Sequence, residues 1–381
     1  MKVLSVFGTR PEAIKMAPVI NELERYPDLF ESVVCVTAQQ RQMLDQVLDL
    51  FKIHPQYDLN VMLPNQDLSD ITSNVLLGLK HVICEVDPDI VLVHGDTTTS
   101  MVAAMAAYYH KKMIGHVEAG LRTYDKFAPF PEEMNRKVTA VLADVHFAPT
   151  ETARQNLLKE GIAPESVFVT GNTVIDALIK ISRLIDNDVE IRDSLNKRFA
   201  FLDCRKKLIL VTGHRRENFG DGIRQICEAL RDIAQSLPDV NILYPVHLNP
   251  HVQGPVRQIL GEGENIFLVA PVDYLVFVYL MKRADLIITD SGGIQEEAPS
   301  LGKPVLVTRT ATERPEAVKV GAVKLVGSDR MTIISEVLYL LNDANAYHKM
   351  SNTCNPFGDG TAADQIVFHL KHILKRKACL I

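Results

Sequence analysis

No stretch of this 381-residue sequence is long and apolar enough to span a membrane, and the nearest candidate, Tyr274 to Met281, is far too short. The first residues, MKVLSVFG, are also too brief for the apolar core of a signal peptide. The six cysteines are scattered without a C-x-x-C pair, so we expect free thiols in a reducing compartment. These absences predict a soluble, cytoplasmic protein without a membrane partner.

Several cofactor and metal signatures are missing too. The sequence contains neither G-x-G-x-x-G nor G-x-x-x-x-G-K-[ST], which counts against a tightly held NAD and against ATP-driven transfer. No set of His, Cys, Asp and Glu has zinc-site spacing, and G-x-S-x-G is absent, so a metal or serine hydrolase is disfavoured. We expect no cofactor and no metal. The net charge of -6 argues against a nucleic-acid partner, although local basic clusters can bind small phosphates.

Short β-branched runs alternate with amphipathic helical patterns, which is typical of parallel sheets with helices on both faces. We expect strands at 3–7, 33–37, 90–94, 113–118, 145–148 and 167–170, then at 208–212, 242–246, 266–269, 286–289, 305–308 and 323–326. The predicted class is α/β, with two doubly wound Rossmann-like domains facing a central cleft. We place one domain at 1–170 plus 362–381, by fold analogy, and the other at 171–361, with 185–207 as a surface connection.

Polar or glycine-rich clusters follow nearly every expected strand. Catalytic residues of open α/β sheets lie at such carboxyl ends, and five clusters in one chain are hard to ascribe to turns alone. The clusters are Gly8-Thr9-Arg10-Pro11-Glu12, His94-Gly95-Asp96, Glu118-Ala119-Gly120-Leu121-Arg122, Gly213-His214-Arg215-Arg216 and Asp290-Ser291-Gly292-Gly293.

The last cluster belongs to a strand–turn–helix unit that predicts an anion site. Gly292 lets a phosphate approach the N–H groups at the start of the helix, and Ser291 adds a hydroxyl. Glu297, about one turn along, can accept hydrogen bonds from a ribose diol. The plainer alternative is an ordinary βα turn followed by a solvated acidic face.

Several cations also follow strands. Arg10 is a fixed cation at the start of the first helix, and Lys15 lies one turn further along; the alternative is a helix-capping segment with a surface arginine. His214 precedes two arginines and suits a diphosphate, because histidine can donate a hydrogen bond to a leaving group. Arg314 supplies another cation. His247 is more simply explained as a structural histidine.

Three carboxylates of the first domain are candidate acid–base groups. Asp96 and Glu118 end neighbouring strands and can face one ligand, while Glu132 lies in the first turn of a helix. The ordinary alternatives are that Asp96 caps the helix beginning near Thr98 and that Glu132 is stabilised by a helix dipole. Phe277 is a core aromatic by default, and near a cleft it would contact a base.

Ten separated blocks, in order and over essentially the whole chain, carry a resemblance to a known family. They are FGTRPEAIKMAP, HGDTTT, HVEAGLRT, PEEMNR, TGNTVIDAL, GHRREN, YPVHLNP, TDSGGIQEEAPSLGKPVLV, TERPEAV and NPFGDG. The chain resembles the non-hydrolysing bacterial UDP-N-acetylglucosamine 2-epimerases. The resemblance implies a GT-B-like pair of domains, a homodimer, and interconversion of UDP-GlcNAc and UDP-ManNAc.

The resemblance also implies residue roles. By this resemblance, Asp96, Glu118 and Glu132 are acid–base groups that act on the sugar, and His214 is a further catalytic residue. Substrate binding falls to Arg10, Lys15, Arg136, Phe277, Ser291, Gly292, Glu297 and Arg314. Some members have a second, regulatory UDP-GlcNAc pocket, to which residues resembling Gln39, Gln42 and His247 contribute, but Asn65 replaces an arginine of that pocket here.

The chemistry follows from the substrate. Carbon 2 has no neighbouring carbonyl to acidify its hydrogen, so we expect elimination of UDP across carbons 1 and 2, giving 2-acetamidoglucal, and re-addition after protonation on the opposite face. The product would supply ManNAc for a surface polysaccharide. Three alternatives stay open: a GT-B glycosyltransferase with a UDP-sugar donor, a hydrolysing epimerase, and a catalytically silent nucleotide-sugar sensor.

Overall fold

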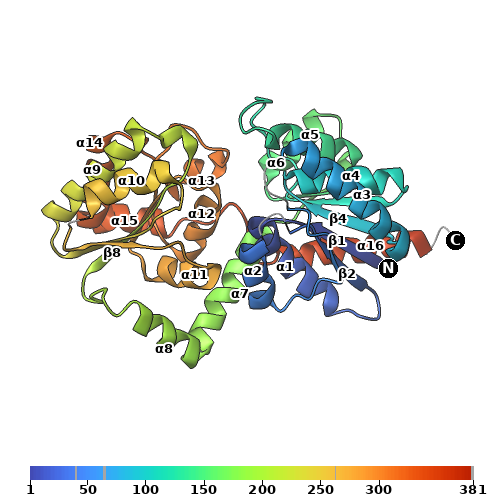
Figure 1. Cartoon of the computed structure of the whole chain (residues 1–381), viewed down its shortest axis with the longest axis horizontal. Helices are drawn as coiled ribbons and strands as arrows, with labels where there is room; N and C mark the ends of the chain where they lie inside the picture. The colour runs from blue at the N-terminus through green and yellow to red at the C-terminus, as the bar shows by residue number, and fades with distance from the viewer. Residues whose placement is uncertain (39–40, 63–65, 262, 379–381) are drawn as a thin grey trace. The chain divides into compact units, whose positions relative to one another are not determined.

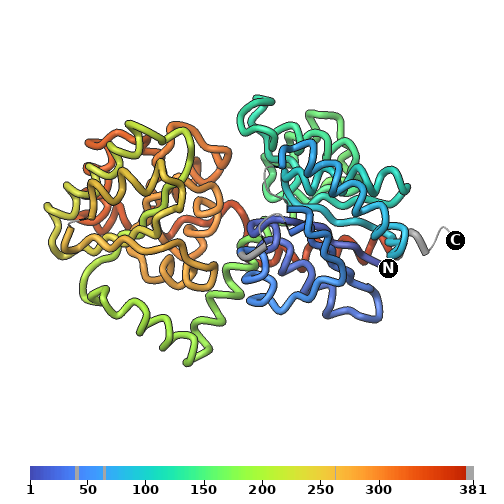
Figure 2. Tube along the Cα trace, in the orientation of Figure 1, coloured from blue at the N-terminus to red at the C-terminus, as the bar shows by residue number. Residues whose placement is uncertain are grey.

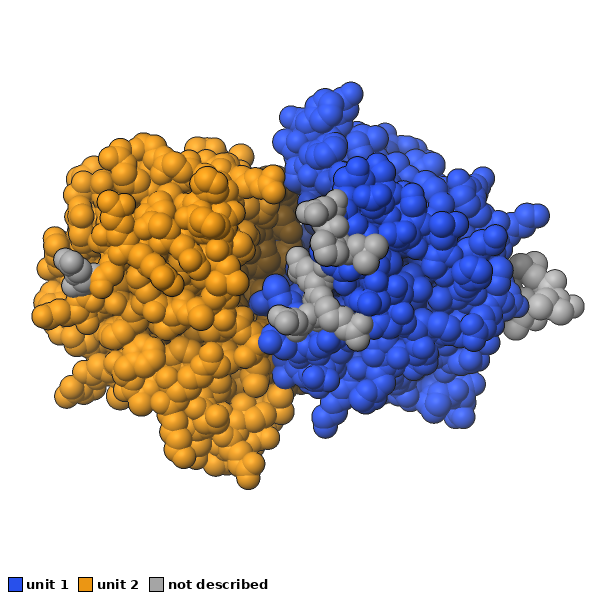
Figure 3. All heavy atoms as spheres, in the orientation of Figure 1, with its two compact units in different colours: residues 1–177, 357–381 blue, residues 178–356 orange. Residues whose placement is uncertain are grey.

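The computed structural model describes residues 1–38, 41–62, 66–261 and 263–378, and for 41–42 and 375–378 it describes the backbone alone. The chain divides into unit 1, Met1–Ala177 with Phe357–Ile381, and unit 2, Leu178–Pro356 (Figure 3). Each unit is built on one parallel sheet with helices packed against it, which confirms the predicted α/β class of two Rossmann-like domains.

The sheet of unit 1 has the strand order β3-β2-β1-β4-β5-β6-β7, and every pairing is parallel. Its strands are β1 (Lys2–Phe7), β2 (Glu31–Val36), β3 (Tyr57–Asp58), β4 (Ile90–His94), β5 (Met113–Val117), β6 (Val145–Ala148) and β7 (Val167–Val169). The sequence does not predict β3, because two residues are too few to show a strand pattern.

The helices of unit 1 pack in two groups (Figure 1). The neighbours α3 (Leu68–Val86), α4 (Thr98–Tyr109) and α5 (Glu132–Leu142) form one group, and α1 (Arg10–Glu24) contacts α2 (Arg41–Phe51) and α16 (Ala362–Ala378) in the other. A further helix, α6 (Glu151–Lys159), packs on β6 and β7. Leu4 of β1, Val91 of β4 and Ala104 of α4 lie fully buried in the core between sheet and helices.

The sheet of unit 2 has the order β10-β9-β8-β11-β12-β13, again all parallel. Its strands are β8 (Lys207–Thr212), β9 (Val240–Pro245), β10 (Ile266–Val269), β11 (Leu286–Thr289), β12 (Val305–Val307) and β13 (Val323–Leu325). Its helices are α8 (Val189–Arg198), α9 (Asp221–Ser236), α10 (Pro250–Leu260), α11 (Tyr274–Arg283), α12 (Gly292–Glu297), α13 (Pro315–Lys319), α14 (Arg330–Asn342) and α15 (Ala344–Ser351).

Residues 185–207, which the sequence predicts as a surface connection, are mostly exposed but helical over much of their length. They include the end of α7 (Thr173–Asn187) and all of α8. The charged composition of α8 concealed its buried contacts: Leu195 is buried, and just beyond the helix Phe199 stacks on Tyr279 with ring centroids 5.9 Å apart. The chain enters unit 2 within α7 and returns to unit 1 at Phe357, and Figure 2 traces both passages.

Each sheet has one point at which the strand order reverses, between β1 and β4 in unit 1 and between β8 and β11 in unit 2. Helices that follow the two strands of such a pair leave on opposite faces, which opens a crevice at the strand carboxyl ends. Four of the predicted polar clusters directly follow these four strands. The topology therefore gives each unit a candidate site of its own at these strand ends.

Candidate active site

Glu12 connects the turns after β1 and β4 in unit 1. Its Oε2 accepts hydrogen bonds from the N–H groups of Gly8 (3.1 Å) and Thr9 (2.8 Å), and its Oε1 accepts from the hydroxyls of Thr97 (2.6 Å) and Ser100 (2.9 Å). Burial raises the pKa of Glu12, and hydrogen bonds from the Gly8 N–H and from the hydroxyls of Thr9, Thr97 and Ser100 oppose that rise. The sequence showed Glu12 within a polar cluster but not this bridging role, because two of its partners lie more than 80 residues away.

Asp96 accepts two hydrogen bonds from one arginine. Nε and Nη2 of Arg136 lie 3.0 and 2.6 Å from Oδ2 of Asp96, and Nδ2 of Asn135 donates to the Asp96 carbonyl at 2.9 Å. The alternative of Asp96 as a helix cap is wrong, because Thr97 caps α4 by accepting a hydrogen bond from Ser100 N at 3.1 Å. The carboxylate of Asp96 stays 26% exposed beside its buried partner and is open to a ligand.

Glu133, which was not among the predicted site residues, holds the loop after β5. It is fully buried and accepts hydrogen bonds from the N–H groups of Thr123 and Tyr124, both at 3.0 Å, and from Nη1 of Arg136 at 3.2 Å. The predicted residue Glu132 opens α5 and is partly exposed. Its Oε2 is buried and has no hydrogen-bond partner among the described residues, an arrangement that often accompanies a functional role.

Glu118 sits at the end of β5 in a left-handed conformation, with φ of 60°. Non-glycine residues rarely adopt this conformation, and where they do it is often part of a functional site. Its Oε2 accepts hydrogen bonds from Nζ of Lys15 and from Nδ2 of Asn172, the latter at 2.7 Å, and Nε2 of His94 is 3.9 Å away. The structure thus brings together Lys15 and Glu118, which the sequence singled out separately. Arg10 is the first residue of α1, which follows β1, and it is partly exposed.

His116 supports the turn that carries Asp96. A ring nitrogen, Nε2, lies 2.8 Å from the carbonyl oxygen of Gly95, and His116 is fully buried on β5. Burial lowers the pKa of His116 to about 3, so the ring is neutral near pH 7 and Nε2 donates this hydrogen bond. Neither its burial nor its partner was visible in the sequence.

Arg314 crosses the start of α12 in unit 2. A Cβ added at Gly292 would lie 2.8 Å from Cζ of Arg314, which shows how closely the guanidinium approaches this glycine. Nε of Arg314 donates to Oε1 of the buried Glu296 at 2.8 Å. Ser291 is the residue before the helix. An arginine, a helix start and a hydroxyl therefore meet at one point, a combination that suits a phosphate.

Glu297 is fixed from a second helix. The Tyr274 hydroxyl donates to its Oε1 at 2.6 Å, and both side chains are buried. Phe277 lies three residues after Tyr274 on α11 and is partly exposed, so the two share a helix face. The hydrogen bond between Tyr274 and Glu297 holds α11 against α12. This arrangement suits a ribose contact at Glu297 next to a ring contact at Phe277.

Asp290 orders the loop that carries His214. Its Oδ2 accepts hydrogen bonds from the N–H groups of His214 (2.9 Å) and Arg215 (2.8 Å), and its Oδ1 is 3.4 Å from Nδ1 of His214. Burial lowers the pKa of His214, while the negative charge of Asp290 acts in the opposite direction. The ring of His214 stacks on His247 with centroids 5.6 Å apart, so these two predicted residues are neighbours.

The predicted regulatory pocket is described only in part. Gln39 and Asn65 lie outside the described residues, and Gln42 belongs to α2 but its side chain is not described. His247 accepts a hydrogen bond at Nδ1 from Asn249 N at 3.1 Å, in addition to its contact with His214. A regulatory role for these residues stays a prediction.

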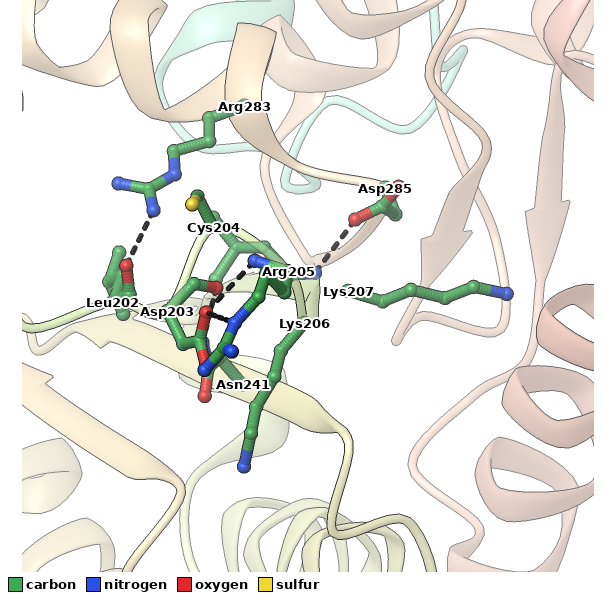
Figure 4. A pocket seen from close by; sticks show the side chains of 10 residues that line it. Leu202, Asp203, Cys204, Arg205, Lys206, Lys207, Asn241, Arg283 and Asp285 are labelled. Atoms are coloured by element: carbon green, nitrogen blue, oxygen red, sulfur yellow. Dashed lines mark hydrogen bonds and ion pairs between the residues drawn. The ribbon is translucent and has the colours of Figure 1, made fainter.

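A separate cavity of about 260 Å³ lies at the opposite, amino-terminal edge of the unit 2 sheet (Figure 4). Its polar groups bond to the protein itself: Arg205 pairs with Asp203 at 2.8 Å, Arg283 donates to Leu202 O at 2.7 Å, and Asp285 accepts from Leu208 N at 2.8 Å. The candidate residues are at the other end of the strands, so this cavity is not the candidate site.

The described part of the chain offers neither a metal cluster nor a membrane-spanning helix. No group of three or more His, Cys, Asp or Glu side chains there is arranged to hold a metal ion. Among the same residues, every helix is too short or too polar to cross a membrane.

Comparisons with known proteins agree with this geometry. The family model described as UDP-N-acetylglucosamine 2-epimerase matches residues 21–371. The UDP-N-acetylglucosamine 2-epimerase of Escherichia coli K12 is 57% identical over 372 residues, covering 98% of this chain and 99% of the relative. The crystal structure of the Neisseria meningitidis enzyme bound to UDP-GlcNAc superposes with a TM-score of 0.93 at 52% identity, covering 98% of this chain and 100% of that one. A Methanocaldococcus jannaschii enzyme in complex with UDP-GlcNAc and UDP gives 0.83 at 34% identity, with coverage of 98% and 100%.

Proposed function

Because the chain belongs to the UDP-N-acetylglucosamine 2-epimerase family, whose members are isomerases, we propose that it interconverts UDP-GlcNAc and UDP-ManNAc by eliminating and re-adding UDP. The observation that supports this most is the kind of group that each unit places at the carboxyl ends of its strands. Unit 1 has Asp96 and Glu118 at its strand ends, whereas unit 2 has Arg314 across a helix start. One substrate that presents its hexose to the acids and its diphosphate to the cation would use both.

In the proposed reaction a carboxylate of unit 1 removes the proton from carbon 2. The C1–O bond to UDP breaks, the electron pair of the C–H bond forms the C1=C2 double bond of 2-acetamidoglucal, and UDP keeps the electrons of the broken bond. A second acid then delivers a proton to the opposite face of carbon 2, and a phosphate oxygen of UDP adds to carbon 1. Donor and acceptor must lie on different faces of the ring, which explains the need for more than one carboxylate.

Unit 2 supplies the groups that a departing nucleotide requires. Arg314 and the N–H groups at the start of α12 would stabilise the negative charge of the leaving diphosphate, with His214 donating a hydrogen bond. Glu297, held by Tyr274, would accept from the ribose hydroxyls. Phe277, on the same face of α11, would contact the uracil.

One experiment separates this function from its alternatives. The protein is incubated with UDP-GlcNAc in deuterated water, and carbon 2 is followed by NMR. We expect UDP-ManNAc and UDP-GlcNAc that both carry deuterium at carbon 2. Free ManNAc would instead indicate a hydrolysing epimerase, turnover only with an added acceptor would indicate a glycosyltransferase, and binding without turnover would indicate a sensor.

We also propose that the chain forms a homodimer. Four large apolar side chains are 60–79% exposed on the adjoining helices α3, α4 and α5, and a partner surface would remove them from water. They are Leu77, Tyr108, Tyr109 and Val141. Light scattering on the purified protein is expected to give twice the mass of one chain.

The setting of the enzyme is likewise a proposal. Cys35 and Cys227 are buried free thiols, and burial raises the pKa of each to about 12, so they remain protonated and suit a reducing cytoplasm. There the product would serve as a ManNAc donor for surface polysaccharide synthesis.

A further inference from the structure

Two backbone segments of unit 1 lie against each other beside Asn172. One leads into α7, along which the chain enters unit 2, and the other begins at Phe357, where the chain returns. The N–H of Asn172 donates to the Phe357 carbonyl at 2.7 Å. Gly171 and Gly358 both have positive φ, and a Cβ added at Gly358 would lie 3.3 Å from Cα of Gly171. The two passages are therefore packed backbone to backbone.

The side chain of Asn172 faces Glu118. Its Nδ2 donates to Oε2 of Glu118 at 2.7 Å, and its Oδ1 accepts from Val174 N at 3.0 Å in the first turn of α7. These two bonds define which side of the amide carries the oxygen, and Asn172 is only 2% exposed. Its side chain has little freedom to move independently of the backbone to which it is tied.

We propose that Asn172 is a positioning residue that holds Glu118 for proton transfer and makes its placement depend on the two passages between the units. The inference rests on the proposed function, in which Glu118 is an acid–base group. The amide of Asn172 and the ammonium of Lys15 both donate to Oε2 of Glu118. Together they fix a side chain whose backbone is in a left-handed conformation.

The chain of contacts is short. A displacement of the Phe357 carbonyl is transmitted through one hydrogen bond to the backbone of Asn172, and through a second to Oε2 of Glu118. Any rearrangement of the passages therefore reaches a catalytic carboxylate without involving the substrate. The geometry of Glu118 is set by the connection between the units as well as by its own strand.

The test is Asn172→Asp, which preserves the size, the backbone hydrogen bond and the Oδ1 acceptor while placing a carboxylate against Glu118. Two carboxylates at this separation raise the pKa of one of them. We expect kcat for epimerisation to fall about 100-fold or more at neutral pH. We expect the acidic limb of the kcat/KM profile to move upward by about one pH unit or more. UDP affinity should stay within about twofold of wild type, because the groups proposed to bind UDP belong to unit 2.

A matched control is Asn21→Asp, the same change at a partly exposed asparagine of unit 1 whose Nδ2 donates to the Phe51 carbonyl at 3.4 Å. It should leave the pH profile unchanged. Asn172→Asp can be combined with Glu118→Gln if it folds poorly, because the new amide at position 118 can then donate to the new carboxylate at position 172. The double variant should regain the melting temperature of the wild type. It should not regain the activity, because Glu118 is absent. A double variant whose melting temperature does not recover would refute the contact between residues 172 and 118.

Gly358→Ala tests the passage itself, since the new Cβ would push against Gly171 and alanine is strained at the positive φ of Gly358. We expect Gly358→Ala alone to lower kcat. Combined with Asn172→Asp, it should lower kcat little further than Asn172→Asp does alone. A wild-type protein that does not turn over UDP-GlcNAc would refute the proposed function. An active wild type, with Asn172→Asp sharing its pH profile and kcat, would overturn this inference alone.

Discussion

Replacing Gly292 by alanine should weaken UDP binding by displacing Arg314. The added Cβ would lie 2.8 Å from both Cζ and Nη1 of Arg314 and 3.2 Å from Nε, so the guanidinium must move. The crowded atoms are the flexible end of a side chain, and unit 2 should therefore fold normally. A charge-assisted hydrogen bond is worth about 1.5–3 kcal/mol, which corresponds to roughly a 10- to 150-fold rise in the Kd for UDP.

Isothermal titration with UDP measures this change, and a double-mutant cycle tests its cause. In an Arg314→Gln background, Gly292→Ala should cost little more, because the displaced guanidinium is already absent. Gly254→Ala is the control, since its Cβ would meet nothing within 4 Å on α10. Equal losses in both backgrounds would mean that the methyl group blocks the phosphate directly, and an unchanged Kd in Gly292→Ala would refute the placement of the diphosphate at α12.

Two further predictions concern unit 1. Asp96→Asn should bind UDP normally but lose turnover by about two to four orders of magnitude, because an amide cannot exchange the proton; near-normal activity in the NMR assay would exclude Asp96 from the reaction. The folded-state pKa of His116 is about 3, below the ordinary value of 6.5, so the stability linked to its neutral form is present above pH 6.5 and is lost as the pH falls toward 3. His116→Gln keeps a donor for Gly95 O but has no imidazole to protonate. Denaturant titrations should show that its free energy of unfolding falls less than that of wild type between pH 6.5 and 4. Parallel curves for the variant and wild type would contradict this.

Elements with a strong local pattern were predictable. β4, β6, β10 and β11 have the bounds expected from their apolar runs, because a buried parallel strand leaves a short β-branched segment in the sequence. β3 and α8 were missed for opposite reasons: β3 is too short to show a period, and α8 is buried at few positions within a charged segment.

Site residues were predictable where they stand at strand ends, and less so where they act through distant partners. The sequence could identify Asp96 and Glu118 from their positions, but not that Thr97, one residue on, is the helix cap, because aspartate and threonine both suit that role. The support given by Asn172 and Glu133 depends on contacts with residues that only the folded chain brings near them. The position of the hexose decides which acid removes the proton from one face of carbon 2 and which delivers a proton to the other face.

The bridging carboxylate of Glu12 has an evolutionary consequence. Because one side chain satisfies the turns after both β1 and β4, a substitution at Thr97 or Ser100 alters the surroundings of Gly8 as well. Neither the turn after β1 nor the turn after β4 can change its sequence alone without leaving part of a buried acid unsatisfied. Variation here is expected in compensated pairs, so exchanging a single loop between related enzymes should fail more often than exchanging the two together.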